Sequence, residues 1–292
     1  MSAPTHQAPA TDPVEVPAPG RLPLAYRALK WLRDHTLAVY SGLALLYMFL
    51  PVAVVIVFSF NKPAGRQNTT WNHFSLDAWL NICRDPSICD SVVVSVEIAL
   101  MATAVATVLG TMIAFALVRH HFRGRSSTNL LIFLPMATPE VVLGSSVLAL
   151  FLNLVFVPLG FWTILIAHIM FCISFVVVTV KARLAGLDPR LEQAAMDLYA
   201  DERTTFRHVT LPLVMPGIGG AAMLAFALSI DDFIITNFNS GSTVTFPMYI
   251  WGAAQRGIPP QVNVIASIMF LGALAIVLIG QVVNARRRRA LS

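Results

Sequence analysis

Long apolar runs separated by short charged segments dominate this chain of 292 residues. A helix needs about 20 mostly apolar residues to cross the hydrocarbon core of a bilayer. Six runs reach that length, at residues 37–59, 91–118, 129–152, 161–180, 213–237 and 262–284. Pro and Gly fall inside several runs, which membrane helices tolerate when neighbouring helices cover the freed backbone groups. The pattern predicts an all-α polytopic membrane protein with six transmembrane helices.

Composition supports this class, because 57% of the residues are hydrophobic and only 12% are charged, whereas soluble domains carry about 25% charged residues. Lys and Arg set the orientation. With both ends cytoplasmic (N-in/C-in), the inner segments hold 16 of the 20 basic residues, as the positive-inside rule requires. This placement accounts for the net charge of +5, so we expect a lipid bilayer around the chain and no nucleic-acid partner.

The three cysteines fall in two settings. Cys83 and Cys89 share one loop that the orientation places outside, where an oxidising compartment would permit a disulfide. The sequence leaves that pairing open. Cys172 lies in an apolar run and is expected to pack there. No Cys/His set has metal-ligand spacing, so we expect no metal site.

The chain ends differ from its middle. Residues 1–20 are rich in Pro and Ala and predict a disordered tail, and residues 21–34 fit a short helix on the cytoplasmic membrane face. The expected organisation is a tail and interfacial helix over 1–36, a transmembrane domain over 37–284 and a basic cytoplasmic tail over 285–292. We expect no signal peptide, because the first long apolar run is too long and has no cleavage site.

A charged segment over residues 188–211 separates two strongly apolar runs in the second half. Asp188 and Pro189 predict the start of one helix, and Asp201 predicts the cap of a second, which Pro212 and Pro216 are expected to end. Helices this short are marginal alone in water. The segment therefore either lies on the membrane surface or docks into a cytoplasmic partner.

Carboxylates are the only charged groups within the predicted spans. They are Glu97, Glu140, Asp231 and Asp232. A charge near the bilayer centre costs several kcal/mol unless it faces protein or water, so each is a candidate functional residue. The two aspartates lie about 28 Å along a helix from Pro212, in the outer half of the fifth span or at its mouth. They either contribute to a transport pathway or mark the helix end.

The other polar groups in the spans leave alternatives open. Glu140 follows Pro139 and is either a cavity ligand or a carboxylate that caps the amides of a broken helix. Glu97 lies about two turns into its span and could reach outward to the interface. His168 fits a hydrogen-bonded packing histidine better than a proton carrier.

These charges bear on the substrate. A pathway with only negative intramembrane charge prefers cations, and separated carboxylates suit a divalent or polyvalent organic cation. An inorganic anion would require Arg, Lys or helix N-termini along its route.

The charged segment resembles the EAA loop of permeases of ATP-binding-cassette (ABC) importers. The spacing of that loop is kept by Gln193-Ala194-Ala195, Tyr199, Val209 and Leu211-Pro212. Gln193 replaces the usual Glu, with Glu192 one place earlier, and Tyr199 replaces the usual Gly. In the family this loop inserts into a cleft of the ATPase subunit. The resemblance implies a coupling surface made of Glu192, Gln193, Ala194, Ala195, Asp197, Tyr199, Leu211 and Pro212.

From about residue 130 to 281 the chain also resembles the second permease subunit of spermidine/putrescine ABC importers. Runs that carry the resemblance include Pro139-Glu140-Val141-Val142 and Ser229-Ile230-Asp231-Asp232-Phe233. The resemblance implies a type I importer permease fold in the bacterial inner (cytoplasmic) membrane, with Asp231, Asp232 and Glu140 along the path of a polyamine cation. The implied partners are a second permease in a heterodimer, two ATPase subunits and an extracytoplasmic binding protein.

The chain itself carries no Walker A motif. We therefore expect a transporter subunit and not an enzyme, without a cofactor of its own, while ATP and Mg²⁺ bind the partner ATPase. One alternative is an ABC permease for another cargo, such as an iron complex, a thiamine-like cation or an amino-acid derivative. Another is a secondary cation transporter that acts alone, which the EAA spacing and the six spans disfavour.

Overall fold

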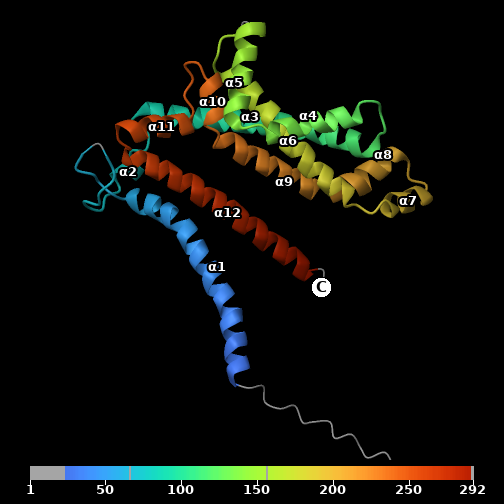
Figure 1. Cartoon of the computed structure of the whole chain (residues 1–292), viewed down its shortest axis with the longest axis horizontal. Coiled ribbons are helices and arrows are strands. Elements are labelled where there is room, and N and C mark those ends of the chain that lie inside the picture. The colour runs from blue at the N-terminus through green and yellow to red at the C-terminus, as the bar shows by residue number, and fades with distance from the viewer. Residues whose placement is uncertain (1–23, 66, 156, 291–292) are drawn as a thin grey trace, which may run out of the picture. The chain divides into compact units, whose positions relative to one another are not determined.

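The computed structural model describes residues 24–65, 67–155 and 157–290, which fall into two units that meet at Val54 and Val55. Apart from one isolated β-bridge, all regular structure in these ranges is helical (Figure 1). The helices are α1 (Leu24–Phe58), α2 (Asp77–Leu80), α3 (Pro86–Arg119), α4 (Arg125–Ala137), α5 (Glu140–Leu150), the π-helical turn η1 (Phe151–Val155), α6 (Phe161–Ala185), α7 (Arg190–Asp197), α8 (Glu202–Thr205), the π-helical turn η2 (Phe206–Thr210), α9 (Leu211–Ile230), α10 (Ile234–Asn239), α11 (Phe246–Arg256) and α12 (Pro260–Ala290).

Helix α1 is one continuous helix with Pro51 inside it. The described part of the helix predicted over residues 21–34 is helical and forms the first turns of α1, and its place on the cytoplasmic membrane face stays a prediction. The predicted tail over residues 1–20 lies outside the described residues, as do residues 291–292. The predicted domain boundaries at 36/37 and 284/285 coincide with no break in α1 or α12.

Five helical stretches of the described chain are long and apolar enough to cross a membrane, and a sixth span results if one bent pair counts as a single crossing. The bent pair is α4 with α5 and η1, which meet at 112°. The predicted third span, 129–152, is therefore broken. The break falls at Thr138, which is extended because a residue before proline is disfavoured in the helical conformation. The six-span count and the N-in/C-in orientation stay predictions.

The predicted fifth span also differs from the structure. The helical run passes without a break from Glu202 through η2 to Ile230, so Pro212 and Pro216 do not end a helix as expected. Neighbouring side chains satisfy backbone groups near them, because Arg183 donates from Nε and Nη2 to the Leu213 carbonyl at 3.1 and 2.9 Å. The run ends earlier than predicted, and a break over residues 231–233 precedes α10.

Helices α3, α6 and α9 pack side by side and form the main core (Figure 1). Small residues of α3 allow the close approach, as is usual in membrane bundles; the buried ones are Ala99, Ala102, Ala106, Gly110 and Ala114. A Cβ at Gly110 would lie 2.7 Å from Cγ1 of Val176. The close approach of α6 to α3 at this position therefore requires glycine.

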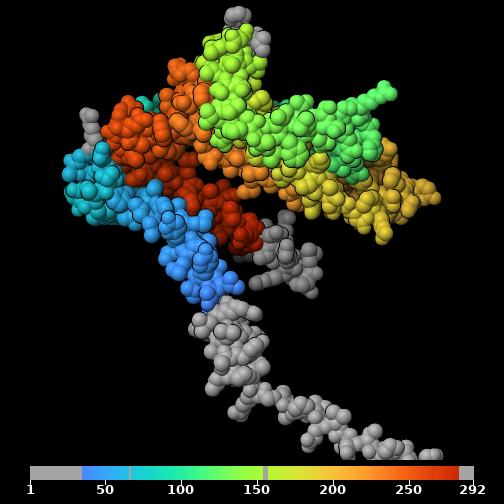
Figure 2. All heavy atoms as spheres, in the orientation of Figure 1, coloured from blue at the N-terminus to red at the C-terminus, as the bar shows by residue number. Residues whose placement is uncertain are grey.

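The two ends of this bundle carry different features. Figure 2 shows the segments of α7 and α8, in gold, at one end, where α9 begins. Beyond the other end of α9, a smaller core joins Ile88, Phe246, Val262 and Ile265, and Ser95 Oγ accepts the Phe246 amide at 2.8 Å. In the same part of the chain Cys83 and Cys89 form a disulfide. Cys172 is a buried free thiol.

Candidate functional site

The break between α9 and α10 separates the environments of the two neighbouring aspartates. Asp231 occupies the C-cap of α9, and its side chain is exposed. The side chain of Asp232 is only 5% exposed and faces inward. The pair therefore lies just past the end of α9, which fits the expected place at the mouth of the fifth span rather than the one in its outer half, and the two carboxylates do not form one shared site.

Asp232 is held by hydrogen bonds from the start of α10. Its Oδ2 accepts the amide and the hydroxyl of Thr236 at 2.8 and 2.9 Å, and its Oδ1 lies 3.4 Å from the Ile235 amide. These amides belong to the first turn of a helix, where backbone N–H groups have no intrahelical acceptor. Asp232 thus acts as the capping side chain of α10.

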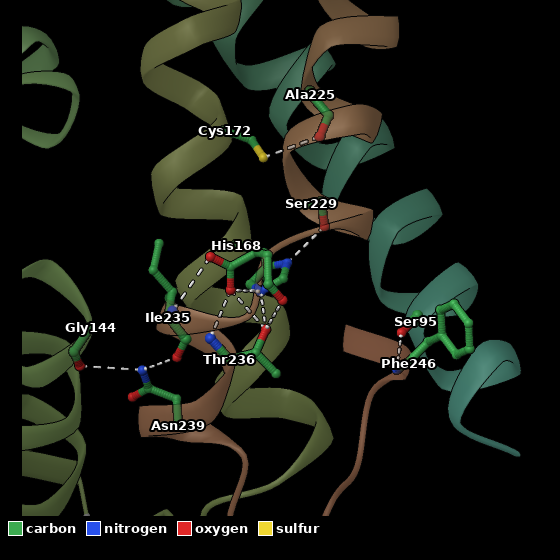
Figure 3. Close-up of polar contacts among 11 residues, drawn as sticks. Ser95, Gly144, His168, Cys172, Ala225, Ser229, Ile235, Thr236, Asn239 and Phe246 are labelled. Atoms are coloured by element: carbon green, nitrogen blue, oxygen red, sulfur yellow. Dashed lines mark hydrogen bonds and ion pairs between the residues drawn. The ribbon is translucent and has the colours of Figure 1, made fainter. Parts of the chain in front are cut away.

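His168 of α6, which is distant in the sequence, lies beside Asp232 and Thr236 and adds to the hydrogen bonds around them (Figure 3). Its Nδ1 lies 2.7 Å from Ser229 Oγ, and its Nε2 lies 2.8 Å from Thr236 Oγ1 and 3.3 Å from Asp232 Oδ2. We call His168, Ser229, Asp232 and Thr236 the break cluster. His168 is hydrogen-bonded and buried, as predicted for a packing histidine, but the sequence analysis did not place it beside an aspartate.

The side chain of Asp231 has no hydrogen bond or ion pair with another residue in the described part of the chain. It continues an exposed stripe of α9 formed by Gly219, Met223 and Ala227, each four residues apart. Residues four apart are neighbours on a helix surface, and each step of four turns the stripe by about 40° around α9. The free carboxylate therefore stands at the end of a smooth, open face of α9, where a cationic group could reach it.

The remaining candidate acids stand apart from the break cluster. Glu140 is the first residue of α5 and is exposed, and it forms no capping hydrogen bond. One turn further on, α5 packs on α10, since Asn239 donates to the Gly144 carbonyl at 3.3 Å. Glu97 is exposed on α3. Neither glutamate has a side-chain partner in the residues described, and no contact brings either to Asp231 or Asp232.

The charged segment between α6 and α9 forms the second candidate site. Asp201 caps α8 by accepting the Thr204 amide at 3.0 Å, as predicted, and hydrogen bonds from the side chain and the amide of Thr204 lower the pKa of Asp201. Asp188 accepts the Arg190 amide at 2.9 Å. Helix α7 begins at Arg190, one residue later than the predicted start at Pro189. No residue of α7 is buried, which leaves the segment open to a partner.

Tyr199 is the most exposed large apolar side chain of this segment. It is 99% exposed, and the neighbouring Leu198 is 81% exposed. The backbone of Tyr199 is left-handed, with φ of 64°, a conformation that costs a non-glycine residue about 1 kcal/mol or more. The position thus keeps the turn that glycine would make easily, while a tyrosine ring projects from its outer side.

Glu192 ties this segment to the end of α3. Its carboxylate pairs with both terminal nitrogens of Arg119, and Thr210 Oγ1 donates to Oε1 at 2.5 Å. The hydrogen bonds from Arg119 lower the pKa of Glu192 below its ordinary value of 4.5, against the opposing effect of burial. The contribution of this pair to the free energy of unfolding is therefore present at pH values above the ordinary pKa of Glu192. It is lost as the pH falls through the lowered pKa of the folded chain.

Among the described residues, the other members of the predicted coupling surface form no ion pair or side-chain hydrogen bond comparable with those of Glu192. Gln193, Ala194 and Asp197 are exposed on α7, and Ala195 is half-buried. At the start of α9, Leu211 is half-buried and Pro212 is exposed. The outward face around Tyr199 therefore carries the exposed apolar side chains of Met196 and Leu198 together with Gln193 and Asp197.

Comparison with known proteins places the chain in a family. Its long apolar helices and the exposed segment between α6 and α9 fit a protein that is embedded in a membrane and docks a partner. Residues 106–289 match the binding-protein-dependent transport system inner membrane component. The chain therefore belongs to this family of ABC transport permeases of the bacterial inner membrane, as the EAA spacing predicts.

Two relatives are similar over most of their length. The spermidine/putrescine transport system permease protein PotC of Haemophilus influenzae is 36% identical over 239 residues, which cover 82% of this chain and 92% of that protein. The putrescine transport system permease protein PotI of Escherichia coli is 36% identical over 238 residues, with 79% and 84% covered.

Two solved structures are similar in fold. A bacterial ABC transporter involved in the import of the acidic polysaccharide alginate has a TM-score of 0.60 at 16% identity, with 91% of this chain and 98% of that chain covered. The MetNI methionine ABC transporter, in inward-facing conformations, gives 0.52 at 15% identity, with 71% and 99% covered. At these identities the likeness shows the fold alone.

Reversing the charges of Arg119 and Glu192 tests the tie between α3 and α7. We expect Arg119→Glu or Glu192→Arg to lower the melting temperature of the purified chain in detergent, by about 2–4 °C for each kcal/mol lost. The double reversal should regain most of the loss, because opposite charges face each other again. Reversal of the exposed pair Arg84 and Asp77 is the control and should change little. A double reversal no more stable than the worse single variant would contradict the tie.

Proposed function

We propose that this chain is a permease subunit of an ATP-driven, binding-protein-dependent importer for polyamines of the spermidine/putrescine class. The observation that carries the cargo assignment is the exposed carboxylate of Asp231 at the end of an open face of α9. A polyamine presents ammonium groups separated by apolar carbon segments. A free carboxylate beside a smooth apolar stripe matches both parts of such a molecule, and the names of the two relatives support the same cargo class.

The proposed partners follow from the exposed surfaces. A second permease, different from this chain, faces it across the pathway. The face around Tyr199 docks into a cleft of an ATPase, and two ATPase subunits bind ATP and Mg²⁺ and hydrolyse the ATP. An extracytoplasmic binding protein delivers the cargo at the segment over residues 239–261, which contains α11. The chain needs no cofactor of its own.

The helical run from α8 to α9 supports a mechanism for coupling. ATP-driven closure of the ATPase subunits moves the segment over residues 188–211. Because α9 has 20 residues and rises 1.5 Å per residue, it connects that segment to Asp231 over about 30 Å. Movement of α9 then opens the pathway alternately to each side of the membrane. Cargo affinity at Asp231 is weak, since a tightly bound cation would not leave.

Changes at Tyr199 test the docking surface. We expect Tyr199→Asp to reduce co-purification of the ATPase and uptake, because it places a charge on an apolar anchor. Tyr199→Phe keeps the ring and should keep both. Tyr199→Gly should stabilise the chain itself by about 1 kcal/mol by removing left-handed strain, yet weaken ATPase binding. Normal ATPase co-purification and uptake in Tyr199→Asp would count against docking at this residue.

Removing both negative charges at the break tests the cargo assignment. We expect the double variant Asp231→Asn, Asp232→Asn to lose polyamine uptake while the permease still assembles with its ATPase. Asp90→Asn, at another exposed carboxylate, is the matched control and should transport normally. Uptake of labelled spermidine and putrescine, together with co-purification, measures both properties. Full uptake by the double variant would exclude a role for this pair in the pathway.

A further inference from the structure

We infer that the two neighbouring aspartates have separate tasks: Asp231 faces the cargo, whereas the break cluster, through Asp232 and His168, is a positioning device that fixes where Asp231 stands. This inference rests on the proposed function for the identity of the cargo. It assigns no cargo contact to Asp232.

The first argument is that the hydrogen-bonding positions of Asp232 are already in use. Two backbone amides and the Thr236 hydroxyl point at its carboxylate, and His168 Nε2 lies 3.3 Å away. A buried carboxylate is tolerated only when such partners surround it. An ammonium group could reach Asp232 only by displacing partners that hold α10 in place.

The second argument concerns the direction of the hydrogen bonds. A hydroxyl has one proton, and Thr236 Oγ1 gives it to Asp232 at 2.9 Å. Thr236 Oγ1 therefore accepts from His168 Nε2 at 2.8 Å. This places a hydrogen on Nε2, while Nδ1 of His168 lies 2.7 Å from the Ser229 hydroxyl. Every member of the break cluster then has a partner.

The third argument is the location of these contacts. Ser229 belongs to the last turn of α9 and Thr236 to the first turn of α10, so His168 of α6 joins both sides of the break. Asp231 lies between them on the chain. Figure 3 shows the ring of His168 between the two helices. Fixing both flanks of the break determines the position of the free carboxylate without contacting it.

The fourth argument is the contrast in exposure between the neighbours. The side chains of His168 and Asp232 are 2% and 5% exposed, whereas Asp231 is exposed and has no side-chain partner in the described chain. Two carboxylates with the same task would share the accessible surface. Here only Asp231 is available to a ligand.

The test compares charge with hydrogen bonding in cells that contain the complete transporter. Asp231→Asn removes the accessible charge and should reduce spermidine uptake about tenfold or more. Asp232→Asn loses the charge but keeps an acceptor oxygen for Thr236 and His168, so it should retain a substantial part of uptake, about a third or more. Asp232→Ala and His168→Leu leave buried donors or acceptors without partners and should be much worse than Asp232→Asn.

A second readout does not depend on the cargo. Asp231→Cys introduces a thiol whose reaction rate with a water-soluble, cationic methanethiosulfonate reports its exposure in the assembled transporter. The chain's own cysteines form a disulfide or are buried. We expect Asp232→Ala or His168→Leu to change this rate about fivefold or more, and Asp232→Asn to change it little. Cys172→Ala, one turn away on the same α6–α9 contact, is the matched control.

The outcomes separate this inference from the proposed function. If wild-type cells take up no polyamine but the labelling rate at position 231 responds to the break cluster, the cargo assignment fails and the positioning role stands. If Asp232→Asn is as defective in uptake as Asp231→Asn and Asp232→Ala leaves the labelling rate unchanged, Asp232 contacts the cargo and the positioning role is overturned.

Discussion

A carboxylate that leaves water must find hydrogen-bond donors or a positive partner, and the end of α9 is built around this requirement. Asp232 meets it with the amides of α10 and with His168, which fixes the point where α9 stops and α10 begins. Asp231, one residue earlier, is partly exposed and has no such partners. The same constraint therefore gives one aspartate a structural role and leaves the other available to a cation.

The opposite end of α9 is held by a different electrostatic contact. Glu192 joins α7 to Arg119 at the end of α3 and to Thr210 just before α9, so the exposed knob around Tyr199 is attached to the core helices at two places. A force applied at this knob reaches α3 and α9 together. The helical run from Glu202 to Ile230 then links the proposed ATPase contact to the free carboxylate.

Much of this arrangement could be predicted from the sequence, because apolar runs, helix caps and the EAA spacing are local signals. The break at Thr138 and the helix end at residues 231–233 were foreseen only as alternatives, since mean apolarity is the same on both sides of a break. The partners of Glu192 and Asp232 were missed for another reason. Arg119 and His168 lie 73 and 64 positions away in sequence, and only packing of α3, α6 and α9 brings them close. The sequence did offer one signal for the buried aspartate: Ser229 and Thr236 place hydroxyl groups about one helical turn before and after Asp232.

Uptake of labelled spermidine and putrescine in cells with and without this chain tests the central claim most directly. The native ATPase, second permease and binding protein must be present, and other polyamine importers must be absent. The account predicts that deletion abolishes uptake and that the chain restores it when it is supplied again. Unchanged uptake after deletion would contradict the polyamine assignment, although the chain would remain an ABC transport permease by its family and fold.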